Sequence, residues 1–159
     1  MSHTQASFAP TRASSISVVQ VGLIAFALYH LALALLMAAA PHTFYSQIGP
    51  FGPQNNHYIR DTATFNAALG FGFLIALRRP AWRIPVLAIT TVQFALHSVN
   101  HLVDIDRAHP AWTGYFDFGS LAMATLLLVW LLHAARADAT TTTAGTPAHE
   151  WPLAERSST

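Results

Sequence analysis

The sequence predicts an all-α fold: an integral membrane bundle of four transmembrane helices with the N and C termini cytoplasmic. Three observations predict this fold class. Only 9% of the 159 residues are charged and 53% are hydrophobic, whereas soluble domains carry about 25% charged residues. The few charges lie at the ends of long apolar runs, and the arginines are distributed unequally between those ends. The net charge of +1 and the lack of a basic stripe predict no nucleic-acid partner.

The first apolar run is the longest and predicts a helix over about residues 17–40. No Asp, Glu or Arg occurs between residues 13 and 59, and residues 18–40 are interrupted mainly by Gln20 and His30. A run of this length suffices to cross a hydrocarbon core of about 30 Å. The preceding residues, 1–16, predict a disordered N-terminal segment.

Three further uncharged runs follow, each of 16 to 20 residues with a charged residue at both ends. They predict helices over about 59–77, 84–104 and 115–136. The first of these runs is the shortest, and it crosses a bilayer if its flanking Asp61 and Arg78 sit at the two interfaces. The Thr-rich segment 137–159 predicts a disordered tail.

The placement of arginine predicts the orientation of the bundle. With four spans, five arginines fall on one side of the membrane and two on the other. The larger group contains Arg12, Arg78, Arg79, Arg83 and Arg136, and the smaller group contains Arg60 and Arg107. Because basic residues favour the cytoplasmic side, both termini are expected inside. We expect a multi-pass protein of the bacterial cytoplasmic (inner) membrane.

Missing residue types narrow the chemistry that this chain can perform. Cysteine and lysine are absent, which excludes thiolate nucleophiles, Cys-ligated metals and a Lys Schiff base. Glutamate occurs only at Glu150 and Glu155, which excludes a di-iron site built on Glu-x-x-His. Histidine, in contrast, occurs nine times, more often than Asp, Glu or Arg.

One stripe of polar residues stands out in the third predicted helix. His97, His101 and Asp104 are spaced i, i+4, i+7 and therefore share one helix face, with Gln93 and Asn100 on or near it. This stripe lies close to the outer end of the helix. Ionisable residues at such a depth nearly always face the bundle interior. The stripe therefore predicts a polar site inside the outer half of the bundle.

Other helices bring ionisable residues to a similar depth. His57 and Asp61 open the second helix, Asp117 opens the fourth, and His30 lies about 15 Å below the outer end of the first. The carboxylates outside the tail and its edge all fall on the outer side. This asymmetry favours a functional site there. Each residue also suits a structural role, as a helix cap or as a buried hydrogen-bonded group.

The residue types favour a transition metal. We predict a metal centre whose ligands come from His97, His101, Asp104, His57 and Asp61. Imidazole combined with carboxylate suits copper, iron or zinc, and an open coordination position suits oxygen chemistry. At this depth the substrate is expected to be an apolar small molecule such as a lipid, quinone, terpenoid or hydrocarbon. The sequence thus favours a metal-dependent membrane oxidoreductase embedded in the lipid bilayer.

Three alternatives remain open at the level of sequence. A b-type haem needs a histidine from each of two facing helices, which His30 and His97 supply. A cofactor-free isomerase or cyclase would use Asp61, Asp104 and Asp117 as catalytic acids and bases. A non-catalytic accessory subunit would pack against other membrane subunits of a respiratory or oxygenase complex, and a homo-oligomer is also compatible with the sequence.

The order of these motifs also suggests a family. His57-Tyr58-Ile59-Arg60-Asp61, a glycine-bearing helix, an Arg-rich inner turn and His97-x3-His101-x2-Asp104 follow one another along the chain. Over residues 18–136 this pattern resembles a group of small bacterial membrane proteins that are loosely similar to the DoxX-like superfamily. The resemblance implies four helices, and it implies no particular reaction.

Overall fold

The computed structural model describes residues 16–144, and in this range the chain is helical with no strand, which confirms the all-α class. The elements in chain order are α1 (Val18–Ala39), α2 (Pro41–Gln47), α3 (Asn56–Arg78), the 3-10 turn η1 (Pro80–Trp82), α4 (Arg83–Val103), the 3-10 turn η2 (Ile105–Arg107) and α5 (Ala111–Ala144). The four long helices overlap the four apolar runs, and α5 extends beyond its run at both ends. Of the segments expected to be disordered, 1–15 and 145–159 lie outside the described residues, whereas 137–144 belongs to α5.

Local signals explain where the helices begin. Ser17 and Gln20 form a capping box at the start of α1. The Asn55 side chain accepts hydrogen bonds from the first backbone N–H groups of α3. Pro41 begins α2, a short helix between the first two predicted helices, because proline suits the first helical position.

The last helix is longer than the sequence predicts. It continues past Arg136 to Ala144, so the beginning of the Thr-rich segment is helical. The hydroxyl groups of Thr140 and Thr141 donate to the Ala137 carbonyl, which satisfies these polar groups within the helix itself.

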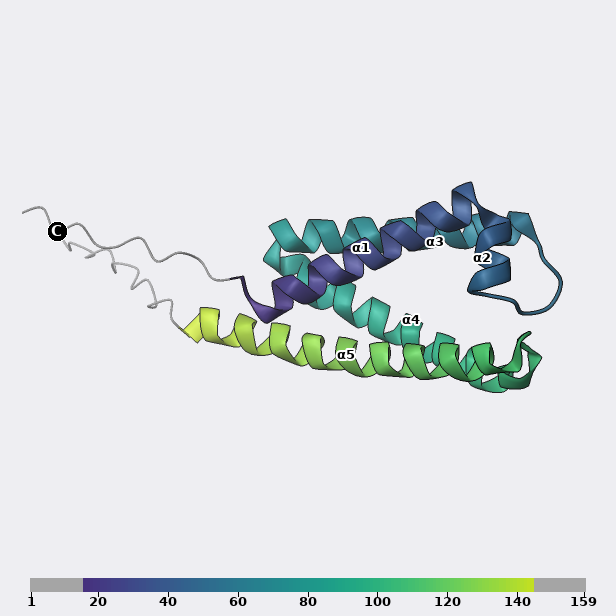
Figure 1. Cartoon of the computed structure of the whole chain (residues 1–159). Coiled ribbons are helices and arrows are strands. Elements are labelled where there is room, and N and C mark those ends of the chain that lie inside the picture. The colour runs from purple at the N-terminus through teal and green to yellow at the C-terminus, as the bar shows by residue number, and fades with distance from the viewer. Residues whose placement is uncertain (1–15, 145–159) are drawn as a thin grey trace, which may run out of the picture.

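The four long helices associate as two antiparallel pairs, α1 with α3 and α4 with α5 (Figure 1). We call the end that holds η1 and the start of α1 the termini end. The opposite end, with residues 41–55 and 104–110, is the loop end. The pairs meet at the termini end and diverge toward the loop end (Figure 1). Contacts between the pairs are fewer than contacts within them.

The shared core lies mainly toward the termini end. It includes Leu23, Phe26, Phe73, Leu87, Phe94, Leu128 and Leu131, all buried. In a bilayer such packing depends on close contact, because lipid is as apolar as the side chains. Small residues allow this contact within the α1–α3 pair: a Cβ on Gly70 would lie 2.7 Å from the Leu31 Cγ.

Three helical segments are long and apolar enough to cross a membrane: Val18–Ala39, Pro80–Val103 and Ala111–Thr141. Their outward faces carry large apolar side chains such as Leu28, Leu96 and Leu126, as expected of a surface in contact with lipid. The α3 helix has 23 residues but is less apolar, because its first half carries residues such as Arg60, Asp61 and Asn66.

Candidate functional site

Two ionisable side chains face each other between α4 and α5 at the loop end. His101 lies in the last turn of α4 and Asp117 in the second turn of α5. The His101 Nδ1 is 4.0 Å from the Asp117 Oδ2, and the side chains are only 13% and 15% exposed. This distance is too long for a hydrogen bond. Within the described part of the chain neither atom has a hydrogen-bond partner, although both are buried.

The short connection between α4 and α5 determines this pairing. After Asp104 the chain turns through η2 and enters α5 at Ala111, so the last turn of α4 packs against the first turns of α5. Gly114 permits the close approach, because a Cβ there would lie 2.0 Å from the Ile105 carbonyl oxygen. Glycine at this position lets η2 lie against α5 and so sets the height of Asp117 relative to His101.

His101 is also enclosed by two rings. The ring of His97, one turn earlier on α4, lies with its centroid 4.7 Å away at 75°. The ring of Phe51 approaches edge-on at 4.8 Å and 86°. The two histidines thus share one face of α4, as their spacing predicts. Phe51 is absent from the site that the sequence predicts, although its position between two Gly-Pro pairs (residues 49–53) indicates a constrained loop.

Asp104 takes a different role from the one its spacing suggests. It is the C-cap residue of α4, and its carboxylate pairs with Arg107 at 3.2 Å. Across residues 16–144, no three His, Cys, Asp or Glu side chains come together in a group that could hold a metal ion. His101 has two ionisable neighbours, His97 with ring centroids 4.7 Å apart and Asp117 with its Oδ2 at 4.0 Å.

His57 and Asp61 lie apart from this cluster. They pair with each other one turn apart on α3, with the His57 Nε2 3.4 Å from the Asp61 Oδ2. Both side chains are well exposed, at 79% and 62%. The structure therefore does not bring these two predicted ligands to His101.

His30 connects α1 to α3 deep in the bundle. Its Nδ1 lies 2.9 Å from the Asn66 Oδ1, and the Asn66 Nδ2 donates to the Thr62 carbonyl at 3.0 Å. This network assigns the His30 proton to Nδ1. The imidazole is 1% exposed, stacks on Phe73 at 5.8 Å and meets Phe94 edge-on at the same distance. A haem at His30 does not fit this packing unless the rings are displaced.

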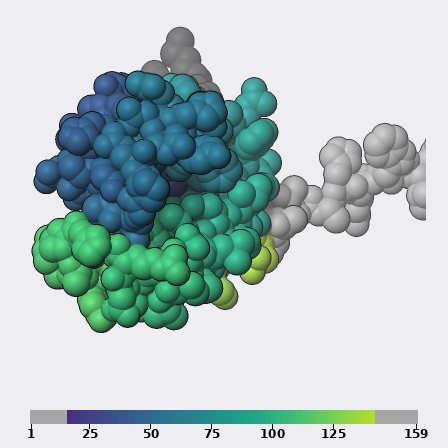
Figure 2. All heavy atoms as spheres, turned by 90° about the vertical axis from the view of Figure 1, so that its right-hand side faces the viewer, coloured from purple at the N-terminus to yellow at the C-terminus, as the bar shows by residue number. Residues whose placement is uncertain are grey.

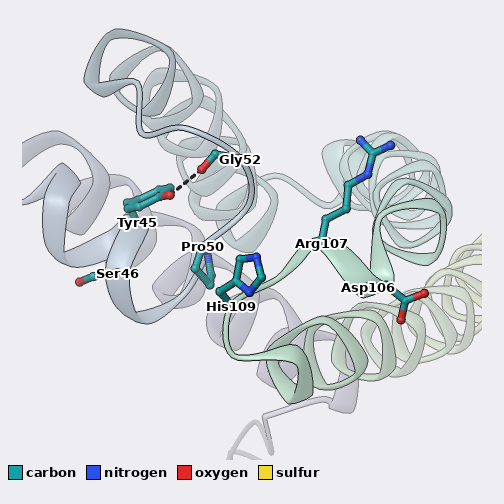
Figure 3. A pocket seen from close by; sticks show the side chains of 7 residues that line it. All are labelled: Tyr45, Ser46, Pro50, Gly52, Asp106, Arg107 and His109. Carbon is teal, nitrogen blue, oxygen red and sulfur yellow. Dashed lines mark hydrogen bonds between the residues drawn. The ribbon is translucent and has the colours of Figure 1, made fainter.

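Two hollows lie at the loop end near His101. The smaller has a volume of about 110 Å³ and is lined by Phe51, Asn100, His101 and Asp104. The larger, of about 650 Å³, lies between the loop after α2 and the turn before α5 (Figure 3). Seen from the loop end, the surface is hollowed between the segment around α2, in blue, and the start of α5, in green (Figure 2). Residues lining the larger hollow are Tyr45, Ser46, Pro50, Gly52, Asp106, Arg107 and His109.

A backbone bridge holds the two loops together beside these hollows. Phe51 and Ala108 form an isolated antiparallel β-bridge. Gly52 adopts a positive φ of 64°, which lets the chain turn back directly after Phe51. The Tyr45 hydroxyl donates to the Gly52 carbonyl and fixes this turn (Figure 3). Phe51 thus contributes its backbone to the bridge and its ring to the surroundings of His101.

Comparisons with known proteins identify no relative. No family model matches the chain, and no curated protein or solved structure matches it either. The resemblance to DoxX-like proteins therefore stays a prediction, and the function must be inferred from the geometry of the site.

Proposed function

We propose that this protein is a membrane enzyme that binds an apolar small molecule at the loop end and acts on it by acid–base chemistry. His101 and Asp117 are the reacting pair. The observation that carries the proposal is the 4.0 Å separation of two buried polar atoms that lack hydrogen-bond partners among the described residues. Buried polar groups are almost always hydrogen-bonded, and an unsatisfied pair facing each other calls for a functional explanation.

The proposed chemistry needs only these two groups. Neutral His101 accepts a proton from a substrate carbon at Nδ1, and protonated Asp117 gives a proton to a neighbouring substrate atom from Oδ2. After the product leaves, the proton on His101 passes to Asp117 and exchanges with solvent, which restores the starting state of the pair. The substrate gains one proton and loses one, so a double bond moves or a ring closes with no net oxidation. His97 and Phe51, with rings within 5 Å of the His101 ring, limit the access of water to the pair.

The proposed location is the outer half of a bacterial cytoplasmic membrane, with four spans and both termini in the cytoplasm. The three apolar helices support the membrane assignment. We infer that α3 crosses with them, because its 23 residues pack along α1 and about 20 helical residues span a bilayer. The excess of arginine at the termini end supports the orientation. A substrate reaching His101 from lipid would be a lipid, quinone, terpenoid or hydrocarbon.

A metal-dependent oxidoreductase is the second candidate. Nitrogen and oxygen ligands bind zinc at about 2.0–2.2 Å, so an ion could join His101 and Asp117 at their 4.0 Å separation with a wide ligand–metal–ligand angle. A turn of the His97 side chain toward the same point would supply a third ligand. This candidate therefore replaces Asp104 of the predicted ligand set by Asp117.

One experiment separates these candidates while the substrate is still unidentified. Membranes containing the protein are incubated in D₂O with a bacterial lipid extract, and the extracted lipids are compared by high-resolution mass spectrometry. Acid–base chemistry incorporates solvent deuterium into a carbon position of one lipid class. We expect this incorporation with the wild type, with and without a chelator, and its loss in Asp117→Asn and in His101→Gln.

The matched control is the exposed pair on α3. The variants His57→Gln and Asp61→Asn remove the same functional groups at the same end of the bundle and should leave the incorporation unchanged. Equal incorporation in wild type and Asp117→Asn would overturn the acid–base proposal. Oxidised products that disappear with a chelator, together with metal in the purified protein, would replace it by the oxidoreductase.

A further inference from the structure

A groove between α3 and α4 lies toward the other end of the bundle. These helices belong to different pairs and touch much less than the partners within a pair. The space left between them has a volume of about 200 Å³. Its lining is apolar and includes Phe65, Ala68, Gly72, Trp82, Pro85 and Ile89.

Small residues on α3 keep this groove open. Ala68 and Gly72 lie one turn apart on the α3 side, where larger side chains would fill the space. A Cβ on Gly72 would already lie 3.2 Å from the Val86 Cγ2. Phe65 and Ile89 are largely exposed and form the two walls. The groove therefore offers an apolar space in which a hydrocarbon chain can lie.

Three arginines lie in the turn that joins α3 to α4, close to Trp82 in the chain. Arg78 ends α3, Arg79 precedes η1, and Arg83 begins α4. The Arg83 Nε lies 3.4 Å from the Ala76 carbonyl, which holds this side chain against the end of α3. Asp138 is an acidic residue nearby and lines a small hollow with Arg83 on the side facing α5. Arg78 and Arg79 are exposed.

We propose that the groove and this arginine cluster bind one anionic phospholipid of the surrounding membrane. An acyl chain lies between Phe65 and Ile89, and the phosphate lies at Arg78 and Arg79. Trp82, half exposed at the end of the groove, sits where tryptophan is favoured, at the level of the headgroups. Arginine binds phosphate through paired hydrogen bonds, and basic pockets between transmembrane helices select anionic lipids.

The proposal is tested on the purified full chain in detergent, by native mass spectrometry with two lipids that share the same acyl chains. The probes are dioleoyl phosphatidylglycerol, which is anionic, and dioleoyl phosphatidylcholine, which is zwitterionic. We expect the wild type to retain the anionic lipid more tightly, with a preference that falls as salt is added. Removing Arg78 and Arg79 as glutamine variants should weaken this preference about fivefold per arginine.

Two further variants make the result specific. Ala68→Phe fills the groove from its exposed side and should weaken binding of both lipids. The control Arg60→Gln/Arg107→Gln removes two charges from the loop end and should keep the full preference. Equal binding of the two lipids by the wild type would overturn the proposal. So would a control that loses as much preference as Arg78→Gln/Arg79→Gln.

Discussion

Gly114→Ala should destabilise the protein and separate His101 from Asp117. The added Cβ would lie 2.0 Å from the Ile105 carbonyl oxygen, whereas ordinary van der Waals contact begins at 3.4 Å. The clash partner is a backbone atom, so no side-chain rotation relieves it. Either η2 or the start of α5 must move by more than an ångström, and Asp117 follows Gly114 by one turn on the same face.

The expected loss of unfolding free energy follows from the backbone that must move. Overpacking of a well-packed site costs about 1–3 kcal/mol. Gly119→Ala is the matched control on the same helix, because a Cβ there meets nothing within 4 Å. The higher helix propensity of alanine should stabilise this variant by up to about 1 kcal/mol. Denaturation in mixed micelles, followed by tryptophan fluorescence, measures both variants. Equal stability of the two variants would refute the reasoning about the α4–α5 connection.

Three further predictions concern other parts of the bundle. Asn66→Leu should lower the free energy of unfolding by about 1–2 kcal/mol, because it leaves the buried imidazole of His30 unpaired. Adding His30→Phe in a double-mutant cycle should recover part of this loss. The chain has no native cysteine, so single cysteines can report the orientation. Gln54→Cys should react with an impermeant maleimide added to intact cells, and Ala81→Cys should react only after lysis. The reverse pattern would contradict the proposed orientation. Arg107→Gln breaks a mostly exposed ion pair and should change stability by less than about 1 kcal/mol, as chemical denaturation would show.

The long helices could be predicted because long apolar runs bounded by charged residues indicate helices of a length that can cross a bilayer. α1, α4 and α5 are each long and apolar enough to span. Two features had no such signal. α2 is too short to produce a periodic pattern, and the start of the Thr-rich segment is helical because α5 continues through it. Composition alone indicates disorder there, since it does not register hydroxyl groups that bond back to the helix.

The site was predicted less completely, because it depends on which helices pair. Helical spacing placed His97, His101 and Asp104 on one face, and two of them do lie together. The carboxylate facing His101 comes from Asp117 on another helix, and no spacing along α4 could select it. α5 begins at Ala111, earlier than predicted, so Asp117 lies inside the helix instead of capping it.

The bridge between Phe51 and Ala108 bears on how fast the proposed ligand would exchange with the surrounding lipid. It joins segments that belong to different helix pairs, and those pairs share their core mainly at the far end. Opening the loop end therefore breaks a small local contact and leaves the helix packing intact, and such local openings cost much less than global unfolding. Residence time of the proposed ligand at His101 would then depend on the lifetime of this bridge and of the contact between the Phe51 and His101 rings, independently of the thermal stability of the bundle.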